Sequence, residues 1–339
     1  MSDVAVVGAG SWGTAFASVL AANNVDTVIW GRRAETVDEI NGARANSSYL
    51  PGVTLPASLR ATHDLEEALA RAPVVVLGIP SHAFREKVVE IAPMLAKDGV
   101  LVSLTKGIER DTLMRMSEVA AEAANVPGSR VAVLSGPNLA KEVAKGLPGA
   151  SVVACSDEAR AHALQRLFHA PTFRVYTNTD VCGVEIGGAT KNVVAIAAGV
   201  ADGLGYGENA LAALVTRGLV EITRLGVRLG ADPLTFAGLA GVGDLVATCL
   251  SKQSRNHHVG EELGKGRKLD DIIASMNMVA EGVKSCAGIL AMAERVSCDM
   301  PIAMRVGKVL YEGADMKEMV DSLLTRDAEP EFLGIVGEG

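Results

Sequence analysis

Aromatic residues are scarce in this sequence, and positive charge is in deficit. Phe, Trp and Tyr make up 4% of the 339 residues, and 32 Lys and Arg stand against 40 Asp and Glu, for a formal net charge of -8. Proteins that bind single-stranded nucleic acid stack bases on aromatic rings, and binders of the phosphate backbone need clustered basic side chains. The composition therefore argues against nucleic acid as a partner.

Cysteine and long apolar runs are also rare. The five cysteines are widely spaced and form no C-x-x-C pair, so we expect neither a disulfide framework nor a zinc site, which indicates a reducing compartment. The first residues carry Asp3 and no basic leader, so no signal peptide is expected. The longest uncharged apolar run, 192–201, is well below the ~20 residues that span a bilayer. These absences predict a cytoplasmic protein without a membrane span.

The rest of the composition is that of a folded protein, with 49% hydrophobic residues and a length that suggests about two domains. In the first half, short β-branched runs alternate with helical stretches, which is typical of an α/β domain with a mostly parallel sheet. The expected strands are 4–7, 27–30, 74–77, 100–103, 131–134, 151–154 and 173–176. The expected helices between them are 14–22, 84–95, 113–124 and 158–169.

The sequence pattern changes after residue 178: Ala, Leu, Gly and Val recur at helical spacing, and strand-like runs nearly vanish. We divide the chain into an α/β domain, 1–178, an all-helical domain, 179–326, and a loose acidic tail, 327–339.

A glycine motif, Gly-Ala-Gly-Ser-Trp-Gly at 8–13, follows the first expected strand and opens the first helix. In such a motif Gly8 permits a tight turn, Gly10 lets the backbone approach a pyrophosphate, and Gly13 allows close helix packing. A glycine turn without a ligand is the alternative, but the strand–turn–helix context favours a Rossmann domain that binds NAD(P).

The end of the second expected strand carries Arg32 and Arg33 where an acid usually holds the 2′-hydroxyl of NAD. A carboxylate would repel a 2′-phosphate, whereas guanidinium groups pair with it. We therefore expect NADPH to be accepted as well as NADH. Two solvated surface arginines are the alternative.

Two lysines are candidates for chemistry. Lys191 precedes an apolar stretch that is typical of a buried helix, so its ammonium group either reaches water or lies in a cleft, where desolvation lowers its pKa. Lys106 follows the strand expected at 100–103, on the side where ligands bind in open α/β sheets, and an ordinary exposed lysine is the alternative.

Other polar residues stand out in the helical half. Asp244 lies in a glycine-rich apolar segment, where it either pairs with a cation such as Lys191 or caps a helix. Ser254 fits a helix N-cap, and Arg255 either binds a phosphate or is a plain surface arginine.

The adjacent His257 and His258 diverge on a helix, and we expect no carboxylate or cysteine at ligand spacing, hence no metal. No G-x-S-x-G elbow is present either, so a serine hydrolase triad is not indicated.

Together these ordered motifs resemble the bacterial-type NAD(P)-dependent glycerol-3-phosphate dehydrogenase family, from about residue 4 to 324. Further segments that carry the likeness are Tyr-Leu-Pro at 49–51, Pro-Ser-His at 80–82, Thr-Lys-Gly at 105–107, Ser-Gly-Pro at 135–137, Gly-Gly-Ala-Thr-Lys-Asn at 187–192, Gly-Val-Gly-Asp-Leu at 241–245 and Gln-Ser-Arg-Asn at 253–256. The resemblance implies a helical domain like that of 6-phosphogluconate dehydrogenases and a homodimer. It also implies hydride transfer between NAD(P)H and dihydroxyacetone phosphate, which yields sn-glycerol 3-phosphate for phospholipid synthesis.

The resemblance also implies residue roles, with Lys191 as the proton-transferring group. The residues it places around the triose phosphate are Lys106, Gly136, Asn138, Lys191, Asp244, Ser254, Arg255 and Asn256. Those it places on the cofactor are Ser11, Trp12, Arg32, Arg33, Tyr49, Lys106, Ala140, Arg255, Val279 and Glu281. Asn138 departs from the family pattern, in which a hydroxyl residue is more usual.

Two other functions stay open from the residues alone. A 3-hydroxyacid dehydrogenase of the 6-phosphogluconate type shares the layout and a catalytic lysine, but takes a carboxylate substrate. An NAD(P)-sensing module without turnover would use only the nucleotide-binding half. The polar residues of the helical half, Lys191, Asp244 and Arg255, argue against the sensing module.

Overall fold

The computed structural model describes residues 3–70, 72–276, 280–315, 317, 330 and 331. The chain divides into two compact units. The first comprises Met1–Lys106 and Met114–Val181, and the second Gly107–Leu113 and Cys182–Gly339. The short excursion of 107–113 into the second unit was not expected from the sequence. Apart from residues 330 and 331, the tail expected at 327–339 lies outside the described residues.

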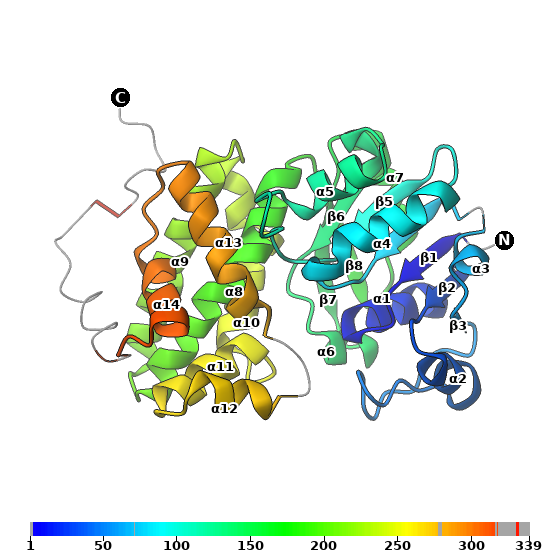
Figure 1. Ribbon diagram of the computed structural model, residues 1–339. Coiled ribbons are helices and arrows are strands. Elements are labelled where there is room, and N and C mark those ends of the chain that lie inside the picture. The colour runs from blue at the N-terminus through cyan, green and yellow to red at the C-terminus, as the bar shows by residue number, and fades with distance from the viewer. Residues whose placement is uncertain (1–2, 71, 277–279, 316, 318–329, 332–339) are drawn as a thin grey trace. The chain divides into compact units, whose positions relative to one another are not determined.

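The first unit is built on an eight-stranded sheet (Figure 1), in the order β3-β2-β1-β4-β5-β6-β7-β8. All neighbouring strands are parallel except β6 and β7. The strands are β1 (Val4–Val7), β2 (Thr27–Trp30), β3 (Arg60–Thr62), β4 (Val74–Leu77), β5 (Val100–Ser103), β6 (Val131–Ser135), β7 (Gly149–Ala154) and β8 (Phe173–Asn178). This order places the carboxyl ends of β1, β2, β4, β5 and β6 on one edge, where open α/β sheets bind ligands.

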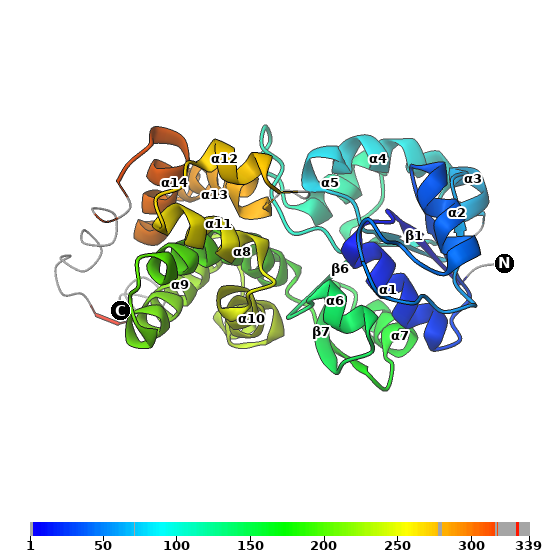
Figure 2. The same cartoon turned by 90° about the horizontal axis from the view of Figure 1, so that it is seen from below.

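Helices cover both faces of this sheet (Figure 2). One face packs on α1 (Ser11–Ala22), α2 (Ala34–Ala43), α6 (Ala140–Ala144) and α7 (Glu158–Phe168). The other packs on α3 (Leu65–Leu69), α4 (Phe84–Ile91) and α5 (Met116–Ala123). The four-residue strands β1, β2 and β4 are buried along their whole length, and apart from Thr27 they are apolar, as is typical of parallel strands covered on both faces.

All seven expected strands are confirmed, as is the mostly parallel α/β class. The strand β3 was missed because its three residues, Arg-Ala-Thr, carry no continuous apolar run. The helix expected at 84–95 ends at Ile91, and a 3-10 turn containing Pro93 follows it.

The regular secondary structure in the described part of the second unit is helical and is centred on α8 (Val181–Gly203), which is buried from residue 183 to 201. The other α-helices are α9 (Glu208–Arg228), α10 (Asp244–Leu250), α11 (Arg255–Gly264), α12 (Leu269–Ala274), α13 (Glu281–Arg295) and α14 (Pro301–Glu312). Among the described helices, α8 alone is long and apolar enough to cross a membrane, but 89% of its most apolar window is buried inside the protein. It therefore has the burial of a core helix.

A buried carboxylate joins two helices of this unit. The oxygens of Glu221 on α9 accept hydrogen bonds from the N–H groups of Ile302 (2.7 Å) and Ala303 (3.3 Å), in the first turn of α14. Burial raises the pKa of Glu221 to about 7, although these hydrogen bonds oppose the rise. The folded protein thus holds this proton more tightly than the unfolded chain, where the carboxyl has its ordinary value of 4.5.

The free energy of unfolding should therefore fall as pH rises from about 4.5 to about 7, because the unfolded chain has released this proton and folding must take it up again. The glutamine in the Glu221→Gln variant is neutral at every pH. We therefore expect the free energy of unfolding of this variant to fall less over this pH range than that of the parent. Urea unfolding of both proteins, followed by circular dichroism at several pH values, measures the two slopes. Equal slopes would rule out Glu221 as the source of the dependence.

Candidate active site

The turn after β1 is shaped by glycine. Gly8 has φ +120°, and a Cβ on it would lie 2.5 Å from the carbonyl oxygen of Gly78. A Cβ on Gly13 would lie 2.1 Å from the carbonyl oxygen of Gly8, so both positions exclude a side chain. A Cβ on Gly10 would meet no atom within 4 Å, so that side of the turn is open.

The N-terminus of α1 at this turn fits a pyrophosphate. Gly10 is the N-cap and supplies no side chain to the first N–H groups, and the first turn holds no acidic residue. These N–H groups and the positive end of the helix favour an anion. On α1 itself, the indole Nε1 of Trp12 is buried without a hydrogen-bond partner among the described residues. The residues present therefore fit a dinucleotide.

Several residues expected at the cofactor gather near this turn. The hydroxyl of Ser11 donates a hydrogen bond to the carbonyl oxygen of Tyr49 (3.0 Å). The guanidinium of Arg33 lies 5.6 Å from the centroid of the Tyr49 ring. Arg32 and Arg33 are both exposed and follow β2 after Gly31, so two basic residues stand at the place where a carboxylate would repel a 2′-phosphate.

A second group lies at the carboxyl ends of β5 and β6. The Nζ of Lys106 donates a hydrogen bond to the carbonyl oxygen of Gly136 (3.2 Å). The Oδ1 of Asn138 accepts one from the hydroxyl of Ser151 (2.7 Å), while its Nδ2 is buried without a partner among the described residues. Such an orphaned donor is typical of a position where a ligand supplies the acceptor. Ala140 opens α6 and packs against the core beneath.

In the second unit, Lys191 forms a buried ion pair with Asp244. The side chains are 8% and 2% exposed, and the ammonium donates hydrogen bonds to Oδ1 of Asp244 and to the hydroxyl of Thr248 (2.7 Å). The hydroxyl of Thr248 in turn donates to the carbonyl oxygen of Asp244 (2.6 Å). The structure confirms the expected pairing of Asp244 with Lys191, and it shows that the ammonium group of Lys191 is buried.

Close backbone packing brings this pair together. A Cβ on Gly187, one turn before Lys191 on α8, would lie 2.6 Å from the carbonyl oxygen of Ala240. The segment Leu239–Gly243 is an irregular helical turn with Gly241 outside helical φ/ψ values, and α10 begins directly after it at Asp244. Glycine at 187 thus lets this turn press against α8, which aims Asp244 at the lysine.

Three residues at the start of α11 were also expected at the substrate. The hydroxyl of Ser254 accepts a hydrogen bond from the N–H of His257 (3.2 Å), which confirms it as the N-cap. Arg255 is the first helical residue and is exposed. The side chain of Asn256 donates to Oδ1 of Asn192 (2.9 Å) and accepts from the N–H of Gly282 (2.9 Å). This amide links α8, α11 and α13 beside Lys191.

The remaining cofactor candidates fall in different places. Glu281 is the first residue of α13 and is half-buried. Val279 lies outside the described residues. Arg255 and Glu281 belong to the second unit, whereas the other described candidates belong to the first.

Sequence reasoning missed one residue at the ion pair and was wrong about another cluster. Thr248 could have been found, because it lies four residues after Asp244 and hence on the same face of α10. The expectation that no carboxylate stands at ligand spacing from His257 is wrong, since Glu261 lies one turn later on α11. Asp202 approaches both residues from α8.

Known proteins resemble the chain over nearly its whole length. Residues 3–161 match the family model described as NAD-dependent glycerol-3-phosphate dehydrogenase N-terminus, and residues 180–321 match the corresponding C-terminus. A glycerol-3-phosphate dehydrogenase [NAD(P)+] of Streptomyces avermitilis is 53% identical and covers 96% of this chain and 97% of its own. That of Thermobifida fusca is 52% identical over 99% of this chain and 100% of its own.

The fold comparison agrees. A crystal structure of glycerol-3-phosphate dehydrogenase from Coxiella burnetii superposes with a TM-score of 0.90 and 38% identity, and the match covers 95% of this chain and 98% of that chain. A ketopantoate reductase from Ralstonia eutropha, at 16% identity and a TM-score of 0.57, shares the fold alone.

Proposed function

Because the chain belongs to the NAD-dependent glycerol-3-phosphate dehydrogenase family and is an NAD(P)-dependent oxidoreductase acting on dihydroxyacetone phosphate and glycerol 3-phosphate, we propose that Lys191 carries its proton transfer. The observation behind this proposal is the buried ammonium group held by Asp244 and Thr248. A charge this deeply buried is costly unless it is paired, so a buried and paired ammonium group is a candidate for a functional role.

The first unit supplies the residues for NAD(P)H. The turn of Gly8, Gly10 and Gly13 and the N-terminus of α1 fit the pyrophosphate, and Arg32 and Arg33 fit a 2′-phosphate. When bound, the reduced nicotinamide supplies the hydride that reduces the substrate carbon. Ser11, Trp12, Tyr49, Lys106 and Ala140 are proposed to complete the contacts in this unit, and Arg255, Val279 and Glu281 those from the helical part.

The reaction needs a positive group at the substrate oxygen. Negative charge builds on the C2 oxygen of dihydroxyacetone phosphate as the carbonyl is reduced, and the Lys191 ammonium stabilises this charge and donates its proton. In the reverse direction the neutral amine takes the proton from the C2 hydroxyl. Asp244 and Thr248 hold the amine in place in both protonation states, because each offers it an oxygen.

The other candidates are assigned to binding the triose phosphate. Arg255 offers a two-pronged donor for the phosphate group, next to the capped N-terminus of α11. Lys106 adds positive potential. The remaining residues proposed to contact the substrate are Gly136, Asn138, Ser254 and Asn256.

Family likeness alone supports three further proposals: a homodimer, a cytoplasmic location, and a role in supplying glycerol 3-phosphate to phospholipid synthesis. Both family models match glycerol-3-phosphate dehydrogenases, which favours this function over a 3-hydroxyacid dehydrogenase or a nucleotide sensor.

The absorbance of reduced nicotinamide, followed with dihydroxyacetone phosphate as substrate, tests the function and the roles of Arg32 and Arg33 together. We expect the parent to oxidise both NADPH and NADH. The double variant Arg32→Ala, Arg33→Ala should lose NADPH affinity by at least about tenfold more than NADH affinity, because only NADPH carries the 2′-phosphate.

The exposed pair Lys141→Ala, Lys145→Ala is the matched control, since it removes two positive charges of the same unit outside the proposed contacts. If the arginine variant lost affinity for NADPH and for NADH equally, Arg32 and Arg33 would not be the residues that bind the 2′-phosphate. Turnover with 6-phosphogluconate in place of dihydroxyacetone phosphate, or binding of NADPH without turnover, would support one of the two alternative functions.

A further inference from the structure

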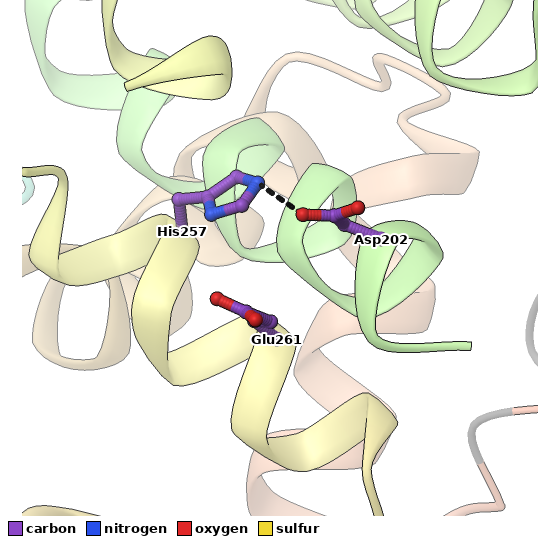
Figure 3. A group of neighbouring side chains, drawn as sticks. All are labelled: Asp202, His257 and Glu261. Carbon is purple, nitrogen blue, oxygen red and sulfur yellow. Dashed lines mark ion pairs between the residues drawn. The ribbon is translucent and has the colours of Figure 1, made fainter. Parts of the chain in front are cut away.

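A cluster of metal-ligand side chains lies on the helical unit, apart from the residues assigned to the reaction. Asp202 stands near the end of α8, and His257 and Glu261 lie one turn apart on α11 (Figure 3). One donor atom from each of the three side chains lies within 4.8 Å of the others. The Nε2 of His257 is 3.7 Å from Oδ2 of Asp202.

The imidazole of His257 is buried, and its Nε2 faces the carboxylate of Asp202. The residue as a whole is 5% exposed. A buried imidazole facing two carboxylates has the donor set of a metal centre.

The two helices are held too closely for these side chains to drift apart. A Cβ on Gly199 would lie 2.0 Å from the carbonyl oxygen of His257, and one on Gly203 would lie 2.2 Å from that of Glu261. The backbones of α8 and α11 are thus in direct contact beside the cluster. The three donors are fixed on rigid elements before any ion binds, which lowers the cost of assembling the site.

We propose that Asp202, His257 and Glu261 bind a divalent transition-metal ion of the zinc type, with water completing the coordination. A histidine and an acid four residues apart put two ligands on one helix face. Donors bound at ~2.0–2.2 Å in a tetrahedral site are roughly 3.5 Å apart, close to the separation of His257 and Asp202. Imidazole favours zinc over magnesium or calcium.

The surroundings leave the donors available. The side chain of Asp202 is 53% exposed, which gives an ion access from solvent. Lys265 donates a hydrogen bond to Oε1 of Glu261 (2.6 Å) and also one to Glu262 (3.1 Å). The second oxygen of Glu261 remains for the metal, and Lys265 keeps Glu262 as a partner.

A bound ion would link the helices that carry the proposed reaction residues. Lys191 lies on α8, and Ser254, Arg255 and Asn256 immediately precede His257 at the start of α11. The ion would therefore stabilise the helical unit against unfolding, because it binds the folded arrangement and not the separated helices.

Calorimetric titration of the chelator-treated full chain with zinc tests the site. We expect one ion per chain at micromolar affinity or tighter. Asp202→Asn and Glu261→Gln should each weaken binding by at least about tenfold, because each removes a charged ligand. His258→Gln, a change at the sequence neighbour outside the cluster, is the matched control and should bind as the parent does. Zinc should raise the Tm of the parent and of this control, but not that of Asp202→Asn.

Cobalt(II) distinguishes this site from one built on cysteine. We expect visible absorption from cobalt in the parent without the near-ultraviolet thiolate band, because no cysteine belongs to the cluster. No binding at about millimolar zinc, a thiolate band, or equal affinity in the parent, Asp202→Asn and Glu261→Gln would overturn the proposal. Both variants change an accessible carboxylate to its amide, and an unchanged far-ultraviolet spectrum and unchanged turnover without zinc show that they fold.

Discussion

Replacing Lys191 by methionine is expected to lower kcat by about 10²–10⁴-fold while NADPH affinity stays within about twofold of the parent. The loss follows from the proposed role, because methionine can neither stabilise charge on the substrate oxygen nor donate a proton. NADPH binding persists since the residues proposed for its phosphates lie in the first unit, whereas Lys191 lies in the second. Methionine is preferred to alanine because it fills much of the volume left by the buried lysine chain.

Steady-state turnover in both directions, with NADPH affinity measured separately by fluorescence titration, checks this expectation. Lys284→Met, an exposed lysine on α13, is the matched control and should retain the turnover of the parent. Turnover of Lys191→Met at the parent's level would show that another group transfers the proton. A loss of NADPH affinity as large as the loss of kcat would show that the substitution disturbs more than the chemistry.

The sequence was sufficient for the elements whose pattern is local. Strands β1 and β4 are continuous apolar runs, and Gly8 and Gly13 mark a turn that leaves no room for a side chain, so the strands and the turn could be predicted. The strand β3 has no such signature, because its place in the sheet comes from pairing with β2. Residues 107–113 belong to the second unit because of a tertiary contact, the burial of Ile108 in the helical core, which the sequence pattern does not reveal.

In the candidate site, too, some features follow from local sequence patterns and others depend on tertiary contacts. Lys191 and Asp244 are conspicuous in the sequence because each is a charge in an apolar segment, but their contact spans 53 positions and no spacing rule predicts it. What makes the contact possible is Gly187, whose missing side chain lets the 239–243 turn approach α8. The histidine and carboxylate cluster could be predicted only in part, because His257 and Glu261 share one helix whereas Asp202 comes from another.

Asp244→Asn is expected to cost about 3–5 kcal/mol of unfolding free energy, among the largest effects of any single substitution in this chain. The amide keeps the shape of the carboxylate but removes its charge, so the Lys191 ammonium, 8% exposed, is left in the interior without a counter-ion. The hydroxyl of Thr248 remains as its partner, but a neutral oxygen does not compensate a buried charge. The lysine then favours its neutral form, so kcat for ketone reduction should fall as well.

The double variant Lys191→Met, Asp244→Asn tests whether the stability cost of Asp244→Asn comes from the uncompensated charge of Lys191 or from a change of side-chain shape. If the cost of Asp244→Asn comes from an uncompensated ammonium, removing that ammonium should restore much of the lost stability, and the double variant should be more stable than Asp244→Asn alone. Denaturant unfolding of the parent, the two single variants and the double variant gives the coupling energy between the two sites. Additive losses would mean that Lys191 and Asp244 stabilise the helical unit independently. In that case the ion pair would not be what orients the amine, and the proposed role of Asp244 would fall with it.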